Sequence, residues 1–238
     1  MPSPPGWHIL LFEVLVMRIP LSARLAACCN FIRPGDRVAD IGCDHGYLGI
    51  YLLKNGIAAS VIAADLREGP LQSAVKISEK FGVRDKMTFY LSDGVRNVPR
   101  DFDTLVCAGM GGDTMVSILS DALWLKNEKY RLILQCQTKN AFLRKYLSEN
   151  GWHIVEETII RDGKFLYTVM EVILRECALT PGQCYFPPAL AGNPQELLAE
   201  YYHFVVQGLE NIVLNRKEQA DPFVAEALKE LKEILWLQ

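Results

Sequence analysis

The sequence predicts an α/β fold in which helices cover a mostly parallel sheet. Apolar runs typical of strands alternate with helix-spaced runs from residue 37 to residue 150, and an Asp-Gly pair then separates two longer strand-like runs. Five strand units with their helices, followed by a hairpin, describe a doubly wound sheet of seven strands with one antiparallel member.

The elements follow one another in chain order. The predicted strands are Arg37 to Ile41, Ser60 to Ala64, Met87 to Leu91, Thr104 to Ala108 and Arg131 to Gln135, and the hairpin strands are His153 to Arg161 and Phe165 to Arg175. The predicted helices cover residues 47–54, 70–80, 114–119 and 139–150. Because parallel strands end at the same sheet edge, the residues that follow each strand are expected to share one crevice.

The first strand meets the first helix in a turn of small and ionisable residues, Asp40-Ile41-Gly42-Cys43-Asp44-His45-Gly46-Tyr47. Glycines there let a ligand approach the backbone, and the helix start offers unpaired N–H groups. The dinucleotide motif G-x-G-x-x-G fails at its second and third glycines, which disfavours hydride chemistry. The methyltransferase motif acid-x-G-x-G-x-G differs at one position, where Asp44 replaces the middle glycine. We therefore expect a cofactor to contact Asp40, Gly42, Cys43, Asp44 and Gly46, with a solvated turn acid as the alternative for Asp44.

Acids also follow the second and third strands. Asp65 comes 25 residues after Asp40, near the spacing of an acid that binds a ribose, and it is the ribose candidate. The alternative is an acid that starts a helix ahead of Gly69-Pro70. Asp93 and Gly94 follow the third strand. We expect Asp40, Asp65 and Asp93 to line one pocket and to bind the cofactor together with Gly94.

The fourth strand is followed by Gly109-Met110-Gly111-Gly112, a segment with little side-chain bulk. Such a loop suits the close approach of a flat substrate, and a flexible turn is the alternative. We expect Ala108, Gly109 and Gly111 to contact the cofactor, and Met110 and Gly112 to contact the substrate.

Several of these segments together resemble the bacterial TrmK family. The resemblance rests on Leu21-Ser22-x-Arg24-Leu25, the 40–48 loop, Glu68-Gly69-Pro70-x-Gln72-Ser73-Ala74, Ala108-Gly109-Met110-Gly111-Gly112 and Leu143-Arg144-x-x-Leu147-x-x-Asn150-Gly151, and it extends from about residue 18 to about residue 172. One departure is Gln135-Cys136, where the family commonly has Gln-Pro. The resemblance implies a class I, Rossmann-like fold that uses S-adenosyl-L-methionine (SAM) to methylate N1 of adenosine 22 in tRNA.

The implied chemistry assigns roles to the first turn. The lone pair of adenine N1 can attack an activated methyl group directly, so alignment is the main requirement. Asp44 is the expected catalytic carboxylate, because it could stabilise the cationic methylated ring or accept a proton, and His45 is the second candidate. Substrate contacts are expected from Tyr47, Met110, Gly112, Gln135, Arg24, Lys139 and Arg144. Tyr47 could instead be a core residue.

Composition limits the partners and the compartment. The net charge of −3 and the pI of about 5.9 do not indicate a polyanion partner, so local basic patches would have to bind tRNA. No later segment resembles a transmembrane helix, and Cys and His residues show no metal-ligand spacing. Seven cysteines, an odd number, fit a reducing cytoplasm better than a disulfide framework.

The chain is expected to divide into four parts. Residues 1–17 are an N-terminal extension that we interpret as an upstream misassigned start, residues 18–176 are the methyltransferase domain, 177–193 are a linker, and 194–238 form two helices capped by Asn193 and Asp221. The resemblance to the TrmK family implies that these helices help to grip tRNA, and a packing or dimerisation element is the alternative. We expect a monomer or weak dimer.

Two other classes of function remain open at this level. A methyltransferase that acts on a small molecule or on another RNA would share every cofactor residue. A non-catalytic SAM-binding module is disfavoured by Asp44 and by the intact Gly109 to Gly112 segment.

Overall fold

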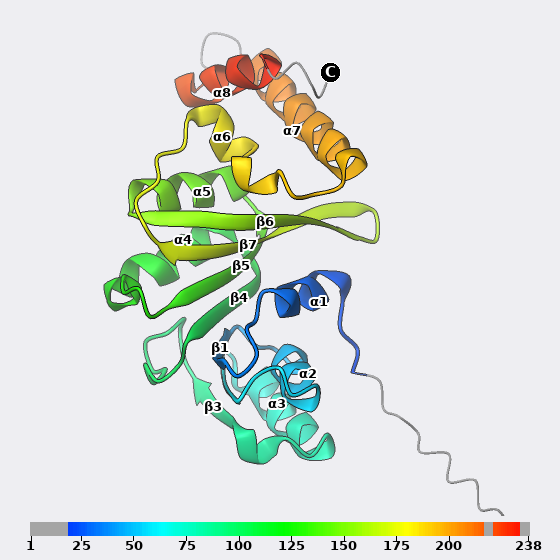
Figure 1. Ribbon diagram of the computed structural model, residues 1–238, viewed down its shortest axis with the longest axis vertical. Coiled ribbons are helices and arrows are strands. Elements are labelled where there is room, and N and C mark those ends of the chain that lie inside the picture. Colours follow the sequence, from blue (N-terminus) through cyan, green and yellow to red (C-terminus); the bar gives the residue numbers. More distant parts are fainter. Residues whose placement is uncertain (1–18, 217–220, 234–238) are drawn as a thin grey trace, which may run out of the picture.

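A single seven-stranded sheet forms the centre of the molecule (Figure 1). The computed structural model describes residues 19–216 and 221–233, so the expected extension 1–17 lies outside the described residues. The strand order is β3-β2-β1-β4-β5-β7-β6. Strands β1 to β5 are parallel, whereas β7 is antiparallel to both β5 and β6. The fold class predicted from the sequence is thereby confirmed.

The structure extends several predicted elements. The strands are β1 Arg37–Ile41, β2 Ser60–Asp65, β3 Met87–Leu91, β4 Thr104–Gly111, β5 Arg131–Thr138, β6 Trp152–Asp162 and β7 Phe165–Leu174. The α-helices are α1 Ala23–Asn30, α2 Tyr47–Lys54, α3 Glu68–Lys80, α4 Gly112–Asp121, α5 Asn140–Glu149, α6 Pro181–Tyr185, α7 Gln195–Arg216 and α8 Pro222–Lys232. Short 3-10 turns are η1 Arg84–Lys86, η2 Leu123–Leu125 and η3 Pro188–Leu190.

Helices cover both faces of the sheet. Side chains of α1, α2 and α3 form one apolar cluster with the sheet, and side chains of α4 and α5 form another on the opposite face. Strand β1 shows the underlying alternation, because Val38 belongs to the first cluster while Ala39 and Ile41 belong to the second. A central parallel strand buried on both sides therefore reads as a continuous apolar run.

The glycine-rich segment after the fourth strand is not the loop expected from the sequence. Strand β4 continues through Gly111, because β5 also extends to Thr138 and pairs with it. The register shifts twice, between Ala108 and Met110 and between Met110 and Gly111, so Gly109 of β4 and Gln137 of β5 each lack a paired residue. The two strands resume pairing beyond this bulged segment, at Gly111 and Thr138.

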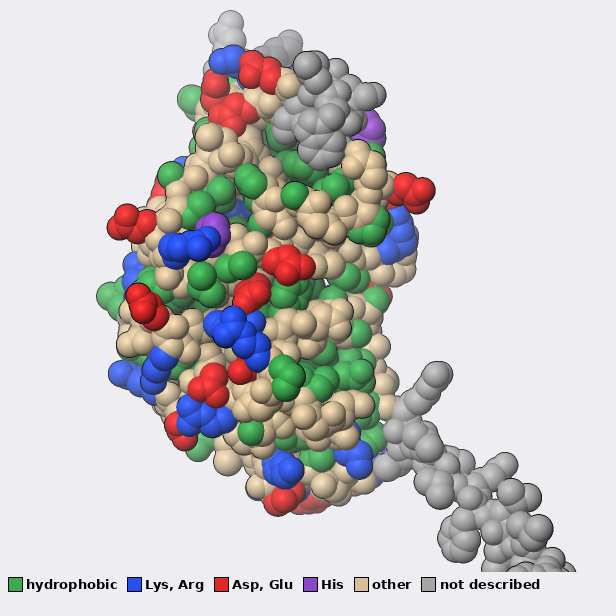
Figure 2. All heavy atoms as spheres, in the orientation of Figure 1, with side chains coloured by type: hydrophobic (Ala, Val, Ile, Leu, Met, Phe, Trp, Pro, Cys, Tyr) green, Lys and Arg blue, Asp and Glu red, His purple; other side chains and the backbone are tan. Residues whose placement is uncertain are grey.

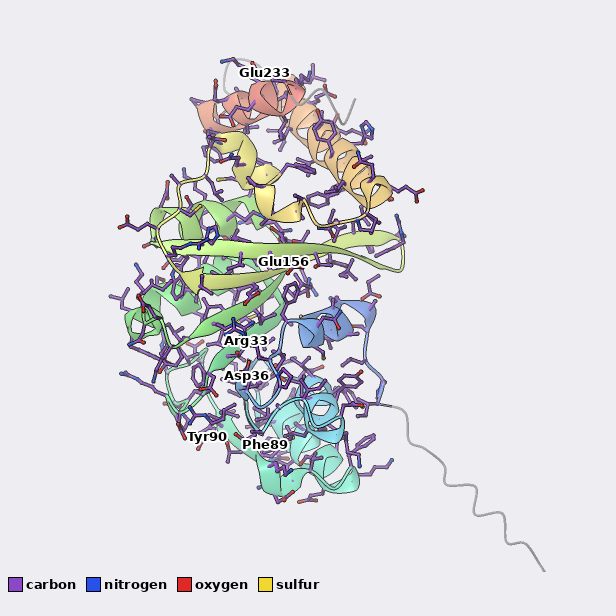
Figure 3. All side chains as sticks on the ribbon, viewed as in Figure 1. Arg33, Asp36, Phe89, Tyr90, Glu156 and Glu233 are labelled. Atoms are coloured by element: carbon purple, nitrogen blue, oxygen red, sulfur yellow. The ribbon has the colours of Figure 1, made fainter. Side chains whose placement is uncertain are left out.

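The N-terminal edge of the sheet carries an ion-pair network. Arg131 is 8% exposed, and its guanidinium pairs with Asp36 at 3.2 Å and with Glu171 at 2.6 Å. Arg33 and Asp36 lie together just before β1 (Figure 3), where the Arg33 N–H donates to the Asp36 carboxylate. This network joins β1, β5 and β7 at the end of the sheet opposite to the carboxyl ends of the parallel strands.

The C-terminal helices form a cap beyond β6 (Figure 1). Their apolar cluster contains Leu198, Tyr201 and Leu209 of α7 with Val224 and Leu231 of α8, and it is joined to the sheet by Ile159. The segment expected to be a linker, 177–193, instead contains α6 and η3, which pack against α5, α8 and β6. The cap is thus continuous with the sheet domain.

The sequence predicts Asn193 and Asp221 as helix N-caps, and only Asp221 acts as one. Asp221 caps α8 by accepting from the Phe223 N–H. Asn193 does not cap α7 in this way, because its amide accepts from the Ile159 N–H and donates to the Glu157 carbonyl. Asn193 therefore ties the start of α7 to β6.

A buried ion pair joins the cap to α5 and β6. Arg144 is 1% exposed, and it donates to the Glu157 carboxylate at 2.6 and 3.1 Å and to the Tyr201 hydroxyl at 3.1 Å. It also donates to the carbonyls of Cys184 and Tyr185. In place of the substrate contact expected from the sequence, Arg144 is an interior residue whose donors are held by protein groups.

Removal of one charged partner of this pair should leave the other as an unpaired charge in the interior. We expect Glu157→Gln to lower the free energy of unfolding by about 3 kcal/mol or more, since an uncompensated buried charge is strongly destabilising. Urea denaturation measures this change. The matched control is Glu149→Gln. It breaks an exposed pair between Glu149 and Lys145, which both lie on α5 with Arg144, and it should have no measurable effect. Equal stability of the two variants would contradict the assignment.

Candidate functional site

One cavity of about 470 Å³ opens at the carboxyl ends of β1, β2 and β4. Thirteen residues expected at the site line it: Arg24, Asp40, Gly42, Cys43, Asp44, His45, Tyr47, Asp65, Asp93, Gly94, Ala108, Gly109 and Met110. The three strand-end acids thus share one cavity wall, as parallel pairing requires. Their binding roles stay predictions.

Asp40 is the most buried acid of this wall. It is 3% exposed, and its Oδ2 atom has no hydrogen-bond partner among the described residues. Burial, followed by the charge of Asp65, raises the pKa of Asp40 to about 7, while a hydrogen bond from the Gly49 N–H opposes the rise. Asp40 is therefore poised to change charge near neutral pH, and its free oxygen can accept a ligand donor.

The turn after β1 needs two left-handed residues in close succession. Gly42 has a φ of 74°, and a Cβ built on it would lie 2.3 Å from the Cε atom of Met110. Asp44 has a φ of 51°, which is uncommon for a residue other than glycine. This backbone explains why glycine is usual at this position of the motif. An aspartate held in this conformation at a cavity is a candidate for function.

The Asp44 side chain points to a polar, accessible corner of the cavity. It is 60% exposed, and the Nε2 atom of His45 lies 3.9 Å from its Oδ2 atom while an Arg67 nitrogen lies 3.8 Å from Oδ1. The rings of His45 and Tyr47 are 5.9 Å apart. A carboxylate, an imidazole and a phenol therefore face the same space at the start of α2.

Asp65 is held rigidly by the backbone of two loops. It is 6% exposed; its Oδ2 atom accepts from the Asp44 N–H at 3.0 Å and its Oδ1 atom accepts from the Arg67 N–H at 2.9 Å. Each carboxylate oxygen can accept more than one hydrogen bond. Asp65 can therefore receive ligand hydroxyls without losing its orientation.

Asp93 lies at a more open part of the wall. Its side chain is 57% exposed and pairs with Arg96, which also pairs with Asp121 at the end of α4. A Cβ on the neighbouring Gly94 would lie 2.9 Å from Ile118 of α4. The loop after β3 is thus packed and ion-paired against α4.

The bulge in β4 forms the opposite wall. Gln135 is fully buried, and its side-chain oxygen accepts from the Gly109 N–H at 3.0 Å. Gln135 was expected to contact substrate, but it lies behind Ala108 and Gly109 and supports the bulge. Met110 projects from the bulge toward Gly42.

Other expected residues lie outside the lining of this cavity. Gly46 precedes α2, where a Cβ would lie 3.0 Å from Ala74, and Gly111 lies against Thr138. A Cβ on Gly112 would lie 2.7 Å from the Lys139 carbonyl, so Gly112 packs the start of α4 on the β5 to α5 turn. Lys139 is exposed and pairs with Asp113 at 2.7 Å. The three glycines are therefore contacts between elements, and Lys139 lies on the surface outside the cavity.

The cavity also contains residues that the sequence analysis missed. They are Leu25, Ile41, Leu48, Leu66, Arg67, Ser92, Thr114, Ile118 and Gln137. Leu66 offered a signal, because it directly follows the strand-end acid Asp65; it is 66% exposed, which is unusual for leucine. Gln137 and Ile118 offered none, since their positions depend on how β5 and α4 meet the other strands.

Burial raises the pKa of the Cys43 thiol well above its usual range, so this thiol stays protonated. A protonated thiol is a weak nucleophile, so Cys43 is expected to line the cavity without reacting. Across residues 19–216 and 221–233, no group of three or more His, Cys, Asp or Glu side chains is arranged to hold a metal ion. In the same residues, no helix combines the length and apolarity needed to cross a membrane.

Comparison with known proteins identifies the family. Residues 21–170 match the family described as a methyltransferase domain. The chain is 34% identical over 157 residues to MG248 of Mycoplasma genitalium, which is assigned as a tRNA methyltransferase. The matched segment covers 64% of this chain and 69% of that protein. It is 31% identical over 153 residues to the tRNA (adenine(22)-N(1))-methyltransferase of Bacillus subtilis, covering 64% of each protein.

Solved structures give the same result over a larger share of the chain. Sp1610 of Streptococcus pneumoniae, assigned as a tRNA (m1A22) methyltransferase and solved with SAM, matches with a TM-score of 0.78 at 29% identity, covering 90% of this chain and 99% of that one. TrmK of B. subtilis, an m1A22 tRNA methyltransferase, matches with a TM-score of 0.76 at 26% identity, covering 92% and 97%. The chain therefore belongs to the methyltransferase-domain family and, within it, to the TrmK family.

Proposed function

We propose that this protein transfers a methyl group from SAM to N1 of adenosine 22 in tRNA. The observation that carries the proposal is the cavity itself, in which the orphaned carboxylate of Asp40, the rigid carboxylate of Asp65 and the exposed carboxylate of Asp44 share one wall. The family matches support it. The seven cysteines are all free thiols, which fits a cytoplasmic protein.

The residues of the cavity fit SAM. Four carboxylates and two arginines line it, so the cavity is acidic and suits a cofactor that carries positive charge. Asp40 offers an oxygen without a partner, Asp65 can accept from ribose hydroxyls, and Leu66 offers an apolar surface to a flat base. When bound, SAM supplies a methyl group on a positively charged sulfur, together with a good leaving group.

The chain then has to orient the acceptor base and stabilise the charge that it gains. Methylation at N1 leaves a cationic adenine ring. The exposed Asp44 carboxylate can accept a hydrogen bond from the exocyclic amine and stabilise this charge, or receive the amine proton. His45 lies beside Asp44 and can orient it.

Local chemistry, not overall charge, must attract the tRNA. On the face drawn in Figure 2, Lys and Arg side chains are interspersed with Asp and Glu side chains. The net charge of −3 agrees with this mixed surface. Arg24 and Lys139 are the basic residues that we propose near the substrate.

The direct test is incubation with labelled SAM and an unmodified tRNA transcript. We expect 1-methyladenosine after nucleoside analysis, and no product from a transcript in which adenosine 22 is replaced by guanosine. Methylation of a metabolite but not of tRNA would favour a small-molecule methyltransferase. SAM binding without methylation of either class would favour a non-catalytic module.

Substitution of Asp44 separates catalysis from cofactor binding. Asn and Gly both tolerate its left-handed backbone, so Asp44→Asn and Asp44→Gly should fold. They should keep most of their affinity for SAM, because the carboxylates of Asp40, Asp65 and Asp93 remain in the cavity. We expect kcat on tRNA to fall by about 10²-fold or more in both, because the charge is lost. Single-turnover kinetics and calorimetric titration with SAM measure the two effects. Wild-type kcat in either variant would exclude a catalytic role for Asp44.

The raised pKa of Asp40 predicts that SAM binds more tightly at higher pH. Below about pH 7 Asp40 is protonated, whereas above it the carboxylate is charged and attracts the cationic cofactor. We expect the Kd for SAM to decrease about tenfold between pH 6 and pH 8, following the ionised fraction of one such group. Isothermal titration calorimetry measures it.

Asp40→Asn is the control for this pH dependence. The amino group of SAM titrates equally with both proteins, so the difference between them isolates Asp40. The same pKa also affects folding: the folded protein keeps a proton that the unfolded chain loses near pH 4, so the stability of the free protein should fall as the pH rises to about 7. Identical pH profiles for the two proteins would contradict the role of Asp40.

A further inference from the structure

A second hollow lies beside the acidic cavity. Its volume is about 440 Å³, which is within the usual size range of ligand pockets, roughly 300 to 1,000 Å³. It runs between the β5 to α5 turn and one side of α7. Gln137 lines both the hollow and the cavity, so the two spaces are neighbours. We call this hollow the amide groove.

The groove is lined by groups that recognise bases. Four amide side chains line it, namely Gln137, Asn140, Gln207 and Asn211. Amides can both donate to and accept from the edges of bases. The Oδ1 atom of Asn140 is buried and has no hydrogen-bond partner among the described residues. A buried acceptor without a protein partner can take a hydrogen bond from a ligand that enters the groove.

Phe204 gives the groove an aromatic surface. It projects from α7, lines the groove and is 67% exposed, although burial of a phenylalanine is favourable. Leu214 on the same helix is similarly exposed, at 71%, but does not line the groove. Proteins that bind single strands commonly stack an unstacked base on an exposed aromatic ring.

Charge separates the groove from the cavity. No Asp or Glu is among the groove residues that the structure describes, whereas four aspartates line the cavity. Lys139 lies on the groove, and its ion pair with Asp113 is exposed enough to exchange for a phosphate. A polyanionic strand would therefore be tolerated in the groove and repelled by the cavity, where only a base should enter.

We propose that the amide groove binds the nucleotides that flank the target adenosine, as a short unstacked strand of tRNA. Phe204 stacks on a neighbouring base, the amides of Asn140 and Asn211 contact base edges, and Lys139 contacts a phosphate. The inference rests on the proposed function, since it assumes that the adenine in the cavity belongs to an RNA strand. It assigns α7 a role in recognition of the local sequence.

The test compares two variants of exposed residues on one helix. We expect Phe204→Ala to weaken equilibrium binding of the unmodified tRNA transcript by at least about fivefold, the effect of losing one base–aromatic stack, while Leu214→Ala binds like the wild type. The dependence of affinity on salt should be unchanged in Phe204→Ala, because stacking releases no counterions. The Kd for SAM should be unchanged in both variants.

A modified tRNA locates the contact. Transcripts with an abasic nucleotide directly before or after adenosine 22 should reduce the affinity of the wild type, and one of them should bind Phe204→Ala and the wild type equally. This equality is specific to a stack between that base and Phe204. A merely structural effect of the substitution would persist on every transcript.

Asn140→Asp gives a second, independent variant. An acid at the first position of α5 favours the helix, whereas burial of one carboxylate oxygen opposes it, so the melting temperature of the variant is measured first to show that it is folded. The new carboxylate cannot donate and repels phosphates, so tRNA affinity should fall while SAM affinity is kept.

The outcomes separate this inference from the proposed function. If the wild type methylates tRNA but Phe204→Ala and Asn140→Asp both bind it as the wild type does, the groove proposal is wrong and the function stands. If the wild type neither binds nor methylates tRNA, the proposed function fails first. A dimer of the wild type that Phe204→Ala dissociates, with tRNA affinity intact, would show that a second copy of the chain occupies the groove.

Discussion

The parallel pairing of β1 between β2 and β4 is the constraint on which the rest of the structure depends. Its register places Ile41 beside Ala64 and Cys107, so β1 and β2 end at nearly the same level and β4 continues past them into its bulge. The N–H groups of Gly42 and Cys43 then both donate to the Ala64 carbonyl and start the turn. The turn, the strand-end acids and the bulge of β4 can meet only because these strands run in one direction.

The cavity concentrates acids in a way that folding alone does not favour. Asp40 is buried without a full set of partners beside Asp65, and Asp44 adopts a left-handed backbone. Each feature costs stability in the free protein. Such costs occur where a ligand or a reaction compensates for them, and a positively charged cofactor would compensate for the acids. The large apolar clusters on both faces of the sheet stabilise the rest of the domain.

The buried pair of Arg144 and Glu157 connects this domain to its helical cap. Because Arg144 also binds the Tyr201 hydroxyl, one side of α7 is held beside the start of α5. The amide groove lies on that side, next to the cavity. An interaction that looks purely structural therefore determines which α7 side chains can approach a substrate.

The sequence by itself determined the alternation of strands and helices, the hairpin at Asp162-Gly163 and the cavity acids, because periodicity and strand-end residues are local signals. It also determined the family, through segments that each carry several diagnostic residues. It could not distinguish an exposed Arg144 from a buried one, since the buried partner, Glu157, lies on another element. Nor could it place Gln135 behind the bulge or Gln137 in the cavity. The two residues lie two positions apart and would share one face of a regular strand, so only the irregular pairing of β5 with β4 at Gln137 separates them. The groove was decided only by tertiary structure, because its two walls are separated by about sixty residues of sequence and meet through packing.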